Sequence, residues 1–403
     1  MNWLWLSLLV LVVGCSLSGT GPQAFDAGPQ ARRLCRETLL LDTHIDLPYR
    51  LHEHWEEVSR RTATGEFDFE RARRGGLNAA FLAIYVPASY GESEALELAE
   101  TEIGLVEKLA ADHPAQCVIG RNADDIEAGF KEGRLVLALG LENGSPIGAD
   151  PGRLAYFYQR GIRYITLTHA LNNPLSDSSF DSSRRWHGLS PLGREVVREM
   201  NRLGIMVDVS HVSDEAFEQI LEISRTPVLA THSSCRHFTP GWERNLSDEM
   251  IRALAERGGV VQINFGSMFI TEAYQKASAR LFAHLGQLME RDGLAQNSPE
   301  IRAAGRQWMQ AHPLPRVTVA DVADHIDHVV GLVGIDHVGL GSDFDGVEGH
   351  LPEGLRDVSE YPNLIQELLS RGYSAADIRK ICAENALRVW RAVEAFGSES
   401  QNG

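Results

Sequence analysis

The chain has 403 residues, of which 43% are hydrophobic and 23% charged, and its formal net charge is −17. This composition is that of a soluble globular protein, and the length suffices for one large domain or two ordinary ones with a sizeable core. The acidic balance argues against nucleic acid and anionic lipid as partners.

The N-terminal sequence MNWLWLSLLVLVVGCS has the features of a secretion signal. Its apolar run is too short for a comfortable transmembrane helix and suits the apolar region of a signal peptide. The VVGC sequence ending at Cys15 resembles the lipobox of bacterial lipoproteins, in which the cysteine is lipidated and becomes the new N-terminus. We therefore predict a lipoprotein-type signal peptide over residues 1–14, although no Lys or Arg precedes the apolar run.

The residues after Cys15 are rich in Gly, Pro, Ser and Ala, as a flexible tether would be. We expect the lipidated cysteine and its tether to span residues 15–35 and the folded domain to span residues 36–403. The protein would then be anchored by lipid in a bacterial cell envelope and face the periplasm or the exterior. Ser16 favours the outer membrane in a Gram-negative cell. A cleaved signal without lipidation and a retained anchor are the alternatives.

From Leu39 onward, short apolar runs alternate with amphipathic segments. Runs that are apolar almost throughout indicate strands buried on both faces, as in parallel sheets. Strands alternating with helices indicate βα units, and eight such units predict a single-domain (β/α)₈ TIM-type barrel. The eight runs are TLLLDTHIDL, LNAAFLAIYV, RLVLALGLENG, IRYITLTHA, GIMVDVSHV, PVLATHSS, GGVVQINF and HVGLGSDFDG.

Helices are expected between these strands, and several begin at Ser-Asp pairs and end at glycines. The expected ranges are 94–111, 190–203, 214–224 and 248–257. A long segment, residues 267–315, precedes the last strand and reads as helical and polar. We interpret it as an insertion on the rim of the barrel, with a lid or an oligomer contact as its two candidate roles.

Polar side chains follow six of the eight apolar runs. In a TIM barrel the active site is built at the C-terminal ends of the strands, so these side chains should meet. Positions two apart in a strand share a face, so His44 and Asp46 should lie on one side of the first strand. Asp42 should lie on the same side, one layer deeper, as a candidate partner of His44. The residues are His44, Asp46, Glu142, His169, His211, His232 and Asp343.

The residue types in this set indicate a metal centre. Imidazole nitrogen and carboxylate oxygen suit zinc, which takes three or four protein ligands and keeps an open position for water in catalytic sites. The set exceeds what one catalytic ion needs. Two ions sharing a carboxylate would use it, and such a pair can hold a bridging hydroxide and polarise a carbonyl.

Six motifs occur in the order found in the membrane (renal-type) dipeptidases, peptidase family M19. They are DTHIDLP, GLENG, RYITLTH, VDVSH, THSS and GSDFDG, and the resemblance runs from about Arg36 to Arg391. It implies a binuclear zinc (β/α)₈ barrel that hydrolyses dipeptides and often accepts a D-residue at the C-terminal position.

The resemblance also implies a role for each matching residue. His44 and Asp46 would bind the first of two Zn²⁺ ions, Glu142 would bridge both ions, and His211 and His232 would bind the second.

Three further residues would serve the substrate in this comparison. His169 would stabilise the developing oxyanion or help to hold the substrate. Asp343 would pass a proton from the bridging hydroxide's parent water to the leaving amine. Arg244 matches the family arginine that contacts the substrate, and Arg236 in CRHFTPGWE is a competing candidate.

Other chemically suggestive residues have plainer interpretations. We expect His325, His328 and Asp345 to be structural. The cysteines other than Cys15 allow up to two disulfides with three pairings. Those at positions 117 and 382 are expected to be buried thiols; the other two are Cys35 and Cys235.

The sequence therefore predicts a lipid-anchored zinc dipeptidase with a dipeptide as its partner molecule. The side chains and the D/L form of the preferred dipeptide stay open, as does the oligomeric state, for which a homodimer is one candidate. Another amidohydrolase reaction on the same barrel, acting on an acyl-amino acid, a lactone or a phosphoester, is the first alternative. A non-catalytic periplasmic binding lipoprotein is the second.

Overall fold

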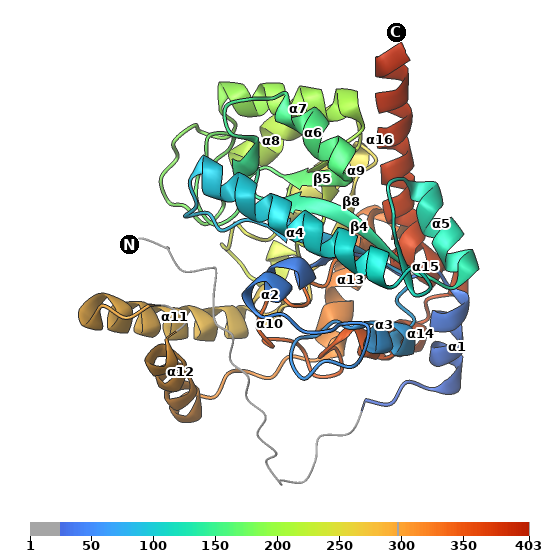
Figure 1. Ribbon diagram of the computed structural model, residues 1–403. Coiled ribbons are helices and arrows are strands. Elements are labelled where there is room, and N and C mark those ends of the chain that lie inside the picture. The colour runs from blue at the N-terminus through green and yellow to red at the C-terminus, as the bar shows by residue number, and fades with distance from the viewer. Residues whose placement is uncertain (1–24, 296–297, 403) are drawn as a thin grey trace.

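The computed structural model of the chain describes residues 25–295 and 298–402 (Figure 1). Within these residues, eight parallel strands follow one another around a barrel in chain order, as the sequence predicts. They are β1 (Leu41–Ile45), β2 (Ala79–Tyr85), β4 (Leu135–Glu142), β5 (Ile162–Thr166), β6 (Met206–Asp208), β7 (Leu229–Ala230), β8 (Val260–Ile263) and β9 (Val338–Leu340).

The barrel closes between β1 and the residues after β9. Ile45 bridges to Phe344 in parallel, and the Asp46 backbone N–H donates to the Phe344 carbonyl over 2.9 Å. The structure adds a strand that the sequence did not suggest: β3 (Cys117–Ile119) lies off the barrel path and pairs with β4. A (β/α)₈ TIM-type barrel is confirmed.

The expected helices are present within a residue or two of their predicted ends. Ser190, Ser213 and Ser247 each cap a helix by accepting a hydrogen bond from the backbone N–H three residues on. The helices are α1 (Pro29–Glu37), α2 (Leu47–Glu53), α3 (Phe69–Gly75), α4 (Glu92–Asp112), α5 (Ala123–Glu132), α6 (Arg153–Arg160), α7 (Pro191–Leu203), α8 (Asp214–Ile223), α9 (Asp248–Glu256), α10 (Ser267–Ile270), α11 (Glu272–Asp292), α12 (Pro299–Ala311), α13 (Val319–Val333), α14 (Tyr361–Ser370), α15 (Ala375–Arg379) and α16 (Asn385–Asn402).

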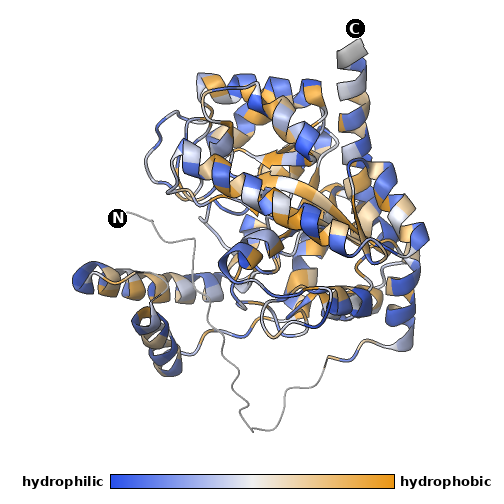
Figure 2. Ribbon diagram, viewed as in Figure 1, coloured by the Kyte–Doolittle hydropathy of each residue, from blue (hydrophilic) through white to orange (hydrophobic). Residues whose placement is uncertain are grey.

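The core has two layers. Apolar strand residues form the interior, and the helices turn their apolar sides to it and their polar sides outward (Figure 2). Inside the barrel, at the N-terminal ends of the strands, Phe81 and Tyr164 pack with Trp390 of α16. Helix α16 thus fills one end of the barrel, and the polar strand ends lie at the other.

The predicted insertion is helical. Helices α11 and α12 pack against each other around Leu281, Leu285 and Ile301, and the pair projects from the barrel at the left of Figure 1. Its base is tied to the loop after β9, where the Tyr274 hydroxyl lies 2.6 Å from His350 Nδ1. The insertion is therefore part of the barrel's rim.

The folded domain begins earlier than expected. Helix α1 packs against α14 and buries Ala31 and Cys35, so the boundary predicted at residue 36 lies too late. The predicted signal peptide and Cys15 lie outside the described residues. In the part of the chain that the structure describes, no helix is both long enough and apolar enough to cross a membrane.

The cysteine pairing left open by the sequence is settled as free thiols. The four cysteines of the described chain are all buried, and none of them pairs with another within it; they are Cys35, Cys117, Cys235 and Cys382.

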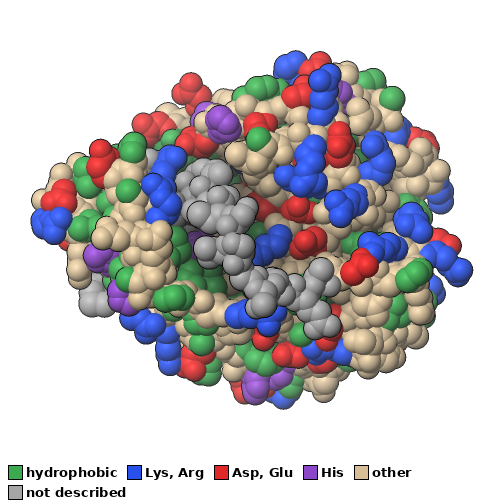
Figure 3. Space-filling view, turned by 90° about the horizontal axis from the view of Figure 1, so that it is seen from below, with side chains coloured by type: hydrophobic (Ala, Val, Ile, Leu, Met, Phe, Trp, Pro, Cys, Tyr) green, Lys and Arg blue, Asp and Glu red, His purple; other side chains and the backbone are tan. Residues whose placement is uncertain are grey.

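Acidic and basic side chains are interspersed on the face of the molecule shown in Figure 3, as on a solvated surface.

Candidate metal centre and active site

The seven predicted side chains meet at the C-terminal ends of the strands. Glu142 is the last residue of β4, and His44 lies in β1, one residue before its end. The other five follow the ends of β1, β5, β6, β7 and β9. Their side chains form three overlapping groups in which all donor atoms lie within 4.8 Å of one another. These are His44, Glu142 and His232; Glu142, His169 and His211; and His44, Asp46 and Asp343.

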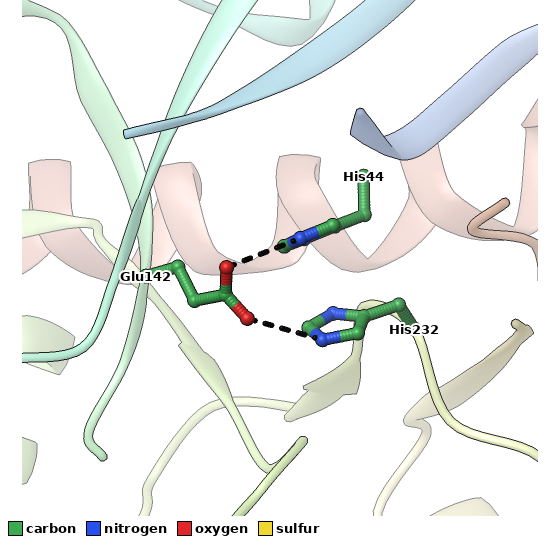
Figure 4. A group of neighbouring side chains, drawn as sticks. All are labelled: His44, Glu142 and His232. Carbon is green, nitrogen blue, oxygen red and sulfur yellow. Dashed lines mark ion pairs between the residues drawn. The ribbon is translucent and has the colours of Figure 1, made fainter. Parts of the chain in front are cut away.

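Glu142 stands between two sets of donors. Its Oε2 lies 3.4 Å from His44 Nε2, and its Oε1 lies 3.1 Å from His211 Nε2 and 3.3 Å from His232 Nε2. Figure 4 shows the two carboxylate oxygens turned toward His44 and His232 respectively. One carboxylate therefore faces two separate positions that a cation could occupy.

The tautomer of His232 is assigned by its neighbours. Asp208 Oδ2 accepts the Thr231 hydroxyl over 2.7 Å, so that hydroxyl has no proton left for the ring. His232 Nδ1, 2.8 Å from Thr231 Oγ1, must then carry the proton and donate it. The lone pair of His232 is on Nε2, which points to the centre, as a metal ligand requires.

His211 presents a second lone pair at the same place. Arg244 Nη2 lies 3.1 Å from His211 Nε2, and a guanidinium can only donate, so this nitrogen is an acceptor. His211 Nε2 is also 2.8 Å from His232 Nε2. Two nitrogen lone pairs at that separation repel each other unless a cation lies between them, so the donor set fits a metal ion. Such an ion would take the lone pair of His211 Nε2 in place of the Arg244 N–H.

His44 completes the other position. Its Nε2 has no hydrogen-bond partner among the described residues and lies 3.4 Å from Asp46 Oδ2. Its Nδ1 lies 2.8 Å from the Tyr164 hydroxyl. This buried imidazole nitrogen lies between the carboxylates of Asp46 and Glu142, an arrangement that can bind a cation. The donor types fit zinc.

Asp42 does not have the role considered from the sequence. Its carboxylate accepts the backbone N–H groups of His44 and Ser342, each over 3.0 Å, and the hydroxyl of Tyr361. It joins β1 to the loop after β9 and leaves the imidazole of His44 to Tyr164. Asp42 therefore contacts the backbone of His44 and not its ring.

Burial and neighbouring charges shift the pKa values of the groups at the centre. Burial acts to raise the pKa of Glu142, but the imidazole of His44 and contacts with His211 and His232 lower that pKa well below the usual range. Burial and the neighbouring carboxylates raise the pKa of Asp46, against the opposing effect of His44. Burial also lowers the pKa of His169 to about 4, so its imidazole is neutral at physiological pH.

His169 lies at the edge of the centre. Its Nε2 is 3.8 Å from Glu142 Oε1, and its ring meets the ring of Tyr85 edge-on at 4.9 Å between centroids. The other nitrogen, Nδ1, is buried and has no hydrogen-bond partner in the described part of the chain. A neutral imidazole with an unused nitrogen beside the metal positions can contact a substrate.

Asp343 is held beside Asp46 by an unusual backbone. Its φ is 65°, in the left-handed region, and Asn264 Nδ2 donates to its Oδ2 over 2.7 Å. A Cβ at Gly346 would overlap both Asp46 Oδ2 and Asp343 Oδ1, so only glycine leaves room there. Asn264 and Gly346 are site residues that the sequence reasoning missed, although Gly346 ends the GSDFDG motif.

The two candidate arginines separate clearly. Arg236 binds Asp214 through both terminal nitrogens, at 2.7 and 2.6 Å, away from the centre. Arg244 is 2% exposed and donates to Ser233 Oγ and to the His232 carbonyl as well as to His211. Burial lowers its pKa to about 10, so it remains a cation beside the centre.

Three other predictions concern structural residues. His325 Nδ1 accepts the Cys235 backbone N–H over 3.0 Å, and its Nε2 lies 2.9 Å from the Ile270 carbonyl. Asp345 forms an ion pair with Arg50 at 3.3 Å. His328 lies away from the metal centre, beside Asp248 at 2.8 Å.

Comparison with known proteins identifies the family. The model of the family "Membrane dipeptidase (Peptidase family M19)" matches residues 29–403. The chain belongs to peptidase family M19. It is therefore a peptide-bond hydrolase of the metallopeptidase class, and the side chains clustered around Glu142 could bind a metal.

Similar proteins support this assignment. The chain is 33% identical to dipeptidase tcpJ of Claviceps purpurea over 347 residues, which cover 84% of this chain and 72% of that protein. The solved structure of the probable dipeptidase PvdM from Pseudomonas aeruginosa has a TM-score of 0.79 and 31% identity, and the match covers 91% of this chain and 98% of that one.

A further solved structure contains a ligand. It is a metallo peptidase from Rhodobacter sphaeroides, liganded with a phosphinate mimic of the dipeptide L-Ala-D-Ala. Its TM-score with this M19 peptidase is 0.73 at 25% identity, and the match covers 88% of this chain and 99% of that chain.

Proposed function

We propose that this M19 peptidase hydrolyses dipeptides with two Zn²⁺ ions. His44 and Asp46 would hold one ion, His211 and His232 the other, and Glu142 would bridge them. The observation that carries the proposal is the division of the Glu142 carboxylate, whose Oε2 faces His44 and whose Oε1 faces the other two imidazoles.

Zinc bound there would lower the pKa of water to about 7 and polarise the substrate carbonyl. The chain's own groups would do the rest. Asp343, grouped with His44 and Asp46, would take a proton from the attacking water and give it to the leaving amine. Asn264 holds one oxygen of that carboxylate and leaves the other, Oδ1, for the proton.

Arg244 and His169 would position the substrate. A dipeptide ends in a carboxylate, and a guanidinium can bind such a group through two parallel hydrogen bonds. Neutral His169 would donate to the oxygen that gains charge as the peptide bond is attacked. Because the Rhodobacter sphaeroides relative binds a mimic of L-Ala-D-Ala, we include L,D-dipeptides among the substrates.

The bridging role is tested by metal analysis of Glu142→Gln. The variant should lose both ions, since an amide cannot bridge them, whereas the matched surface change Glu127→Gln should keep them. Metal content by mass spectrometry decides the matter, and two retained ions in Glu142→Gln would refute the bridge.

The proton-transfer role is tested by Asp343→Asn. This variant should keep its metal and lose about 10²–10⁴-fold in kcat toward an L,L- and an L,D-dipeptide. Asp345→Asn, which alters the neighbouring carboxylate paired with Arg50, should keep far more activity. Turnover of acylated amino acids in place of dipeptides would redirect the substrate assignment, and unchanged kcat in Asp343→Asn would exclude the proton transfer.

We also propose that Cys15 is lipidated and that the enzyme faces the periplasm or the exterior from a bacterial envelope membrane. The support is the VVGC sequence after a short apolar run. Metabolic labelling with a palmitate analogue should mark the full chain and not Cys15→Ala, which should be released from membranes.

A further inference from the structure

A second cluster of metal-binding side chains lies outside the M19 centre. Its members are His237, Asp248 and His328, each of which offers one donor atom, and these atoms all lie within 4.8 Å of one another. His328 Nε2 is 2.8 Å from Asp248 Oδ1, and the rings of the two histidines stack at 4.4 Å between centroids.

The three residues come from different elements. His237 lies in a short 3₁₀ helix (Arg236–Phe238) after β7, Asp248 begins α9, and His328 lies on α13. One imidazole thus contacts the carboxylate of Asp248, and the second stacks on the first. The cluster is open to solution, since His237 is exposed and the side chains of His328 and Asp248 are 17% and 30% exposed.

Space is available to complete a coordination sphere. A shallow hollow of about 450 Å³ adjoins the cluster, lined by His328 together with Phe238, Asp324, Asp327, Gly331 and Leu332. Water can fill the remaining positions of an ion there. Donors around a tetrahedral zinc lie about 3.3 Å apart, and those of the three residues lie within 4.8 Å of one another. The exposed ring of His237 would turn out of its stack on His328 to close the sphere.

We infer that His237, Asp248 and His328 form a third metal site, for a divalent transition ion such as Zn²⁺. Two imidazole nitrogens and one carboxylate oxygen are a donor set that suits such ions and not Mg²⁺ or Ca²⁺, which prefer oxygen. This site uses none of the ligands proposed for the catalytic pair.

An ion at this site would also affect the segment 237–248, which carries Arg244. The segment between His237 and Asp248 carries Arg244, and its start is already joined to α13 by the bond from Cys235 N–H to His325. An ion held by His237, Asp248 and His328 would join both ends of this segment to α13. It would restrict the motion of the segment and so of Arg244.

The experiment is a Zn²⁺ titration of the enzyme as purified, followed by equilibrium dialysis and metal counting. Wild type should bind one equivalent more than the double variant His237→Ala/His328→Ala, which should keep the catalytic ions. The control His284→Ala/His312→Ala removes two histidines of the insertion and should keep the extra equivalent. Hydrogen exchange of residues 236–248 should slow with Zn²⁺ in wild type and not in the double variant.

Asp248→Asn separates a metal site from a simple His–Asp contact. Asparagine still accepts the hydrogen bond from His328, so a structural pair would survive, but the loss of the anion should lower Zn²⁺ affinity at this site at least tenfold. Glu142→Gln should lose the catalytic ions and still take up the extra one, which keeps the two proposals distinct. An equal metal count in wild type and in His237→Ala/His328→Ala would overturn the third site.

Discussion

At the residue scale, two imidazoles at the centre, those of His44 and His232, each depend on a group behind the ring. The Tyr164 hydroxyl meets His44 Nδ1, and Thr231, held by Asp208, accepts from His232 Nδ1. Such partners fix the tautomer and the orientation of the ring, so the ligand nitrogen is ready for the ion before it arrives.

Tyr164→Phe removes one of these partners and little else. The phenyl ring still packs against Phe81 inside the barrel, so the fold should persist, but His44 Nδ1 loses its contact with the hydroxyl. We expect metal affinity to fall about 10–100-fold, measured by competition with a chelator. Tyr373→Phe, which removes a hydroxyl bonded to Asp327 at the surface, should leave the affinity unchanged.

Gly346→Ala tests the space between two carboxylates. Its methyl group would overlap Asp46 Oδ2 and Asp343 Oδ1, so both acidic side chains must move. We expect loss of metal and of dipeptidase activity in a protein whose circular dichroism is that of wild type. Gly104→Ala in α4, where the added methyl would have no contact within 4 Å beyond its own helix backbone and chain neighbours, should behave as wild type.

At the element scale, α13 braces the loops around the mouth of the barrel. Through His325 it contacts Cys235, after β7, and Ile270, at the end of α10. Burial lowers the pKa of this histidine to about 4, so it is neutral in the folded protein at pH 7.

This histidine makes the fold sensitive to acid. Above the unfolded pKa of 6.5 neither state is protonated at His325, and stability is unaffected by pH through this group. As the pH falls from 6.5 to about 4, the unfolded chain binds a proton at His325 and the folded chain does not. The free energy of unfolding falls by about 3 kcal/mol over this range. Denaturant unfolding over this range should show a flatter pH dependence for His325→Gln than for wild type or for His312→Gln, an exposed control.

At the scale of the whole molecule, the barrel separates stability from chemistry. Trp390 of α16 is 1% exposed and fills the end at which the strands begin, whereas the side chains that could bind a metal occupy the end at which they finish. Tyr164 connects the two ends inside the barrel. Its ring packs on Phe81 near the end at which the strands begin, and its hydroxyl contacts His44 at the other end.

Trp390→Ala should therefore reduce stability without reducing catalysis. Removing the buried indole should lower the free energy of unfolding by about 3–5 kcal/mol. Metal content and kcat of the protein that remains folded should match wild type, because the cavity opens at the far end. Tyr156→Ala, at a side chain that is 42% exposed, should cost much less, and a large loss of kcat in Trp390→Ala would contradict the separation.

Much of this architecture could be predicted because its signals are local. A strand buried on both faces needs an apolar run, and a residue near its C-terminal end must lie at the rim of the barrel. The eight strands and the seven polar residues at their ends could therefore be predicted from local sequence. Helix α1 and strand β3 could not, because their burial depends on α14 and β4, to which no local pattern points.

The sequence by itself determined the kind of barrel, the donor types at its rim and the family motifs that group them. Only the tertiary structure decided which oxygen of Glu142 faces which imidazole, that Tyr164 and not Asp42 supports the ring of His44, and that Arg244 reaches the centre while Arg236 is bound to Asp214. The physical reason is that side-chain rotation and packing between distant segments are set by the closed barrel, and a strand's alternation gives only the side on which each residue begins.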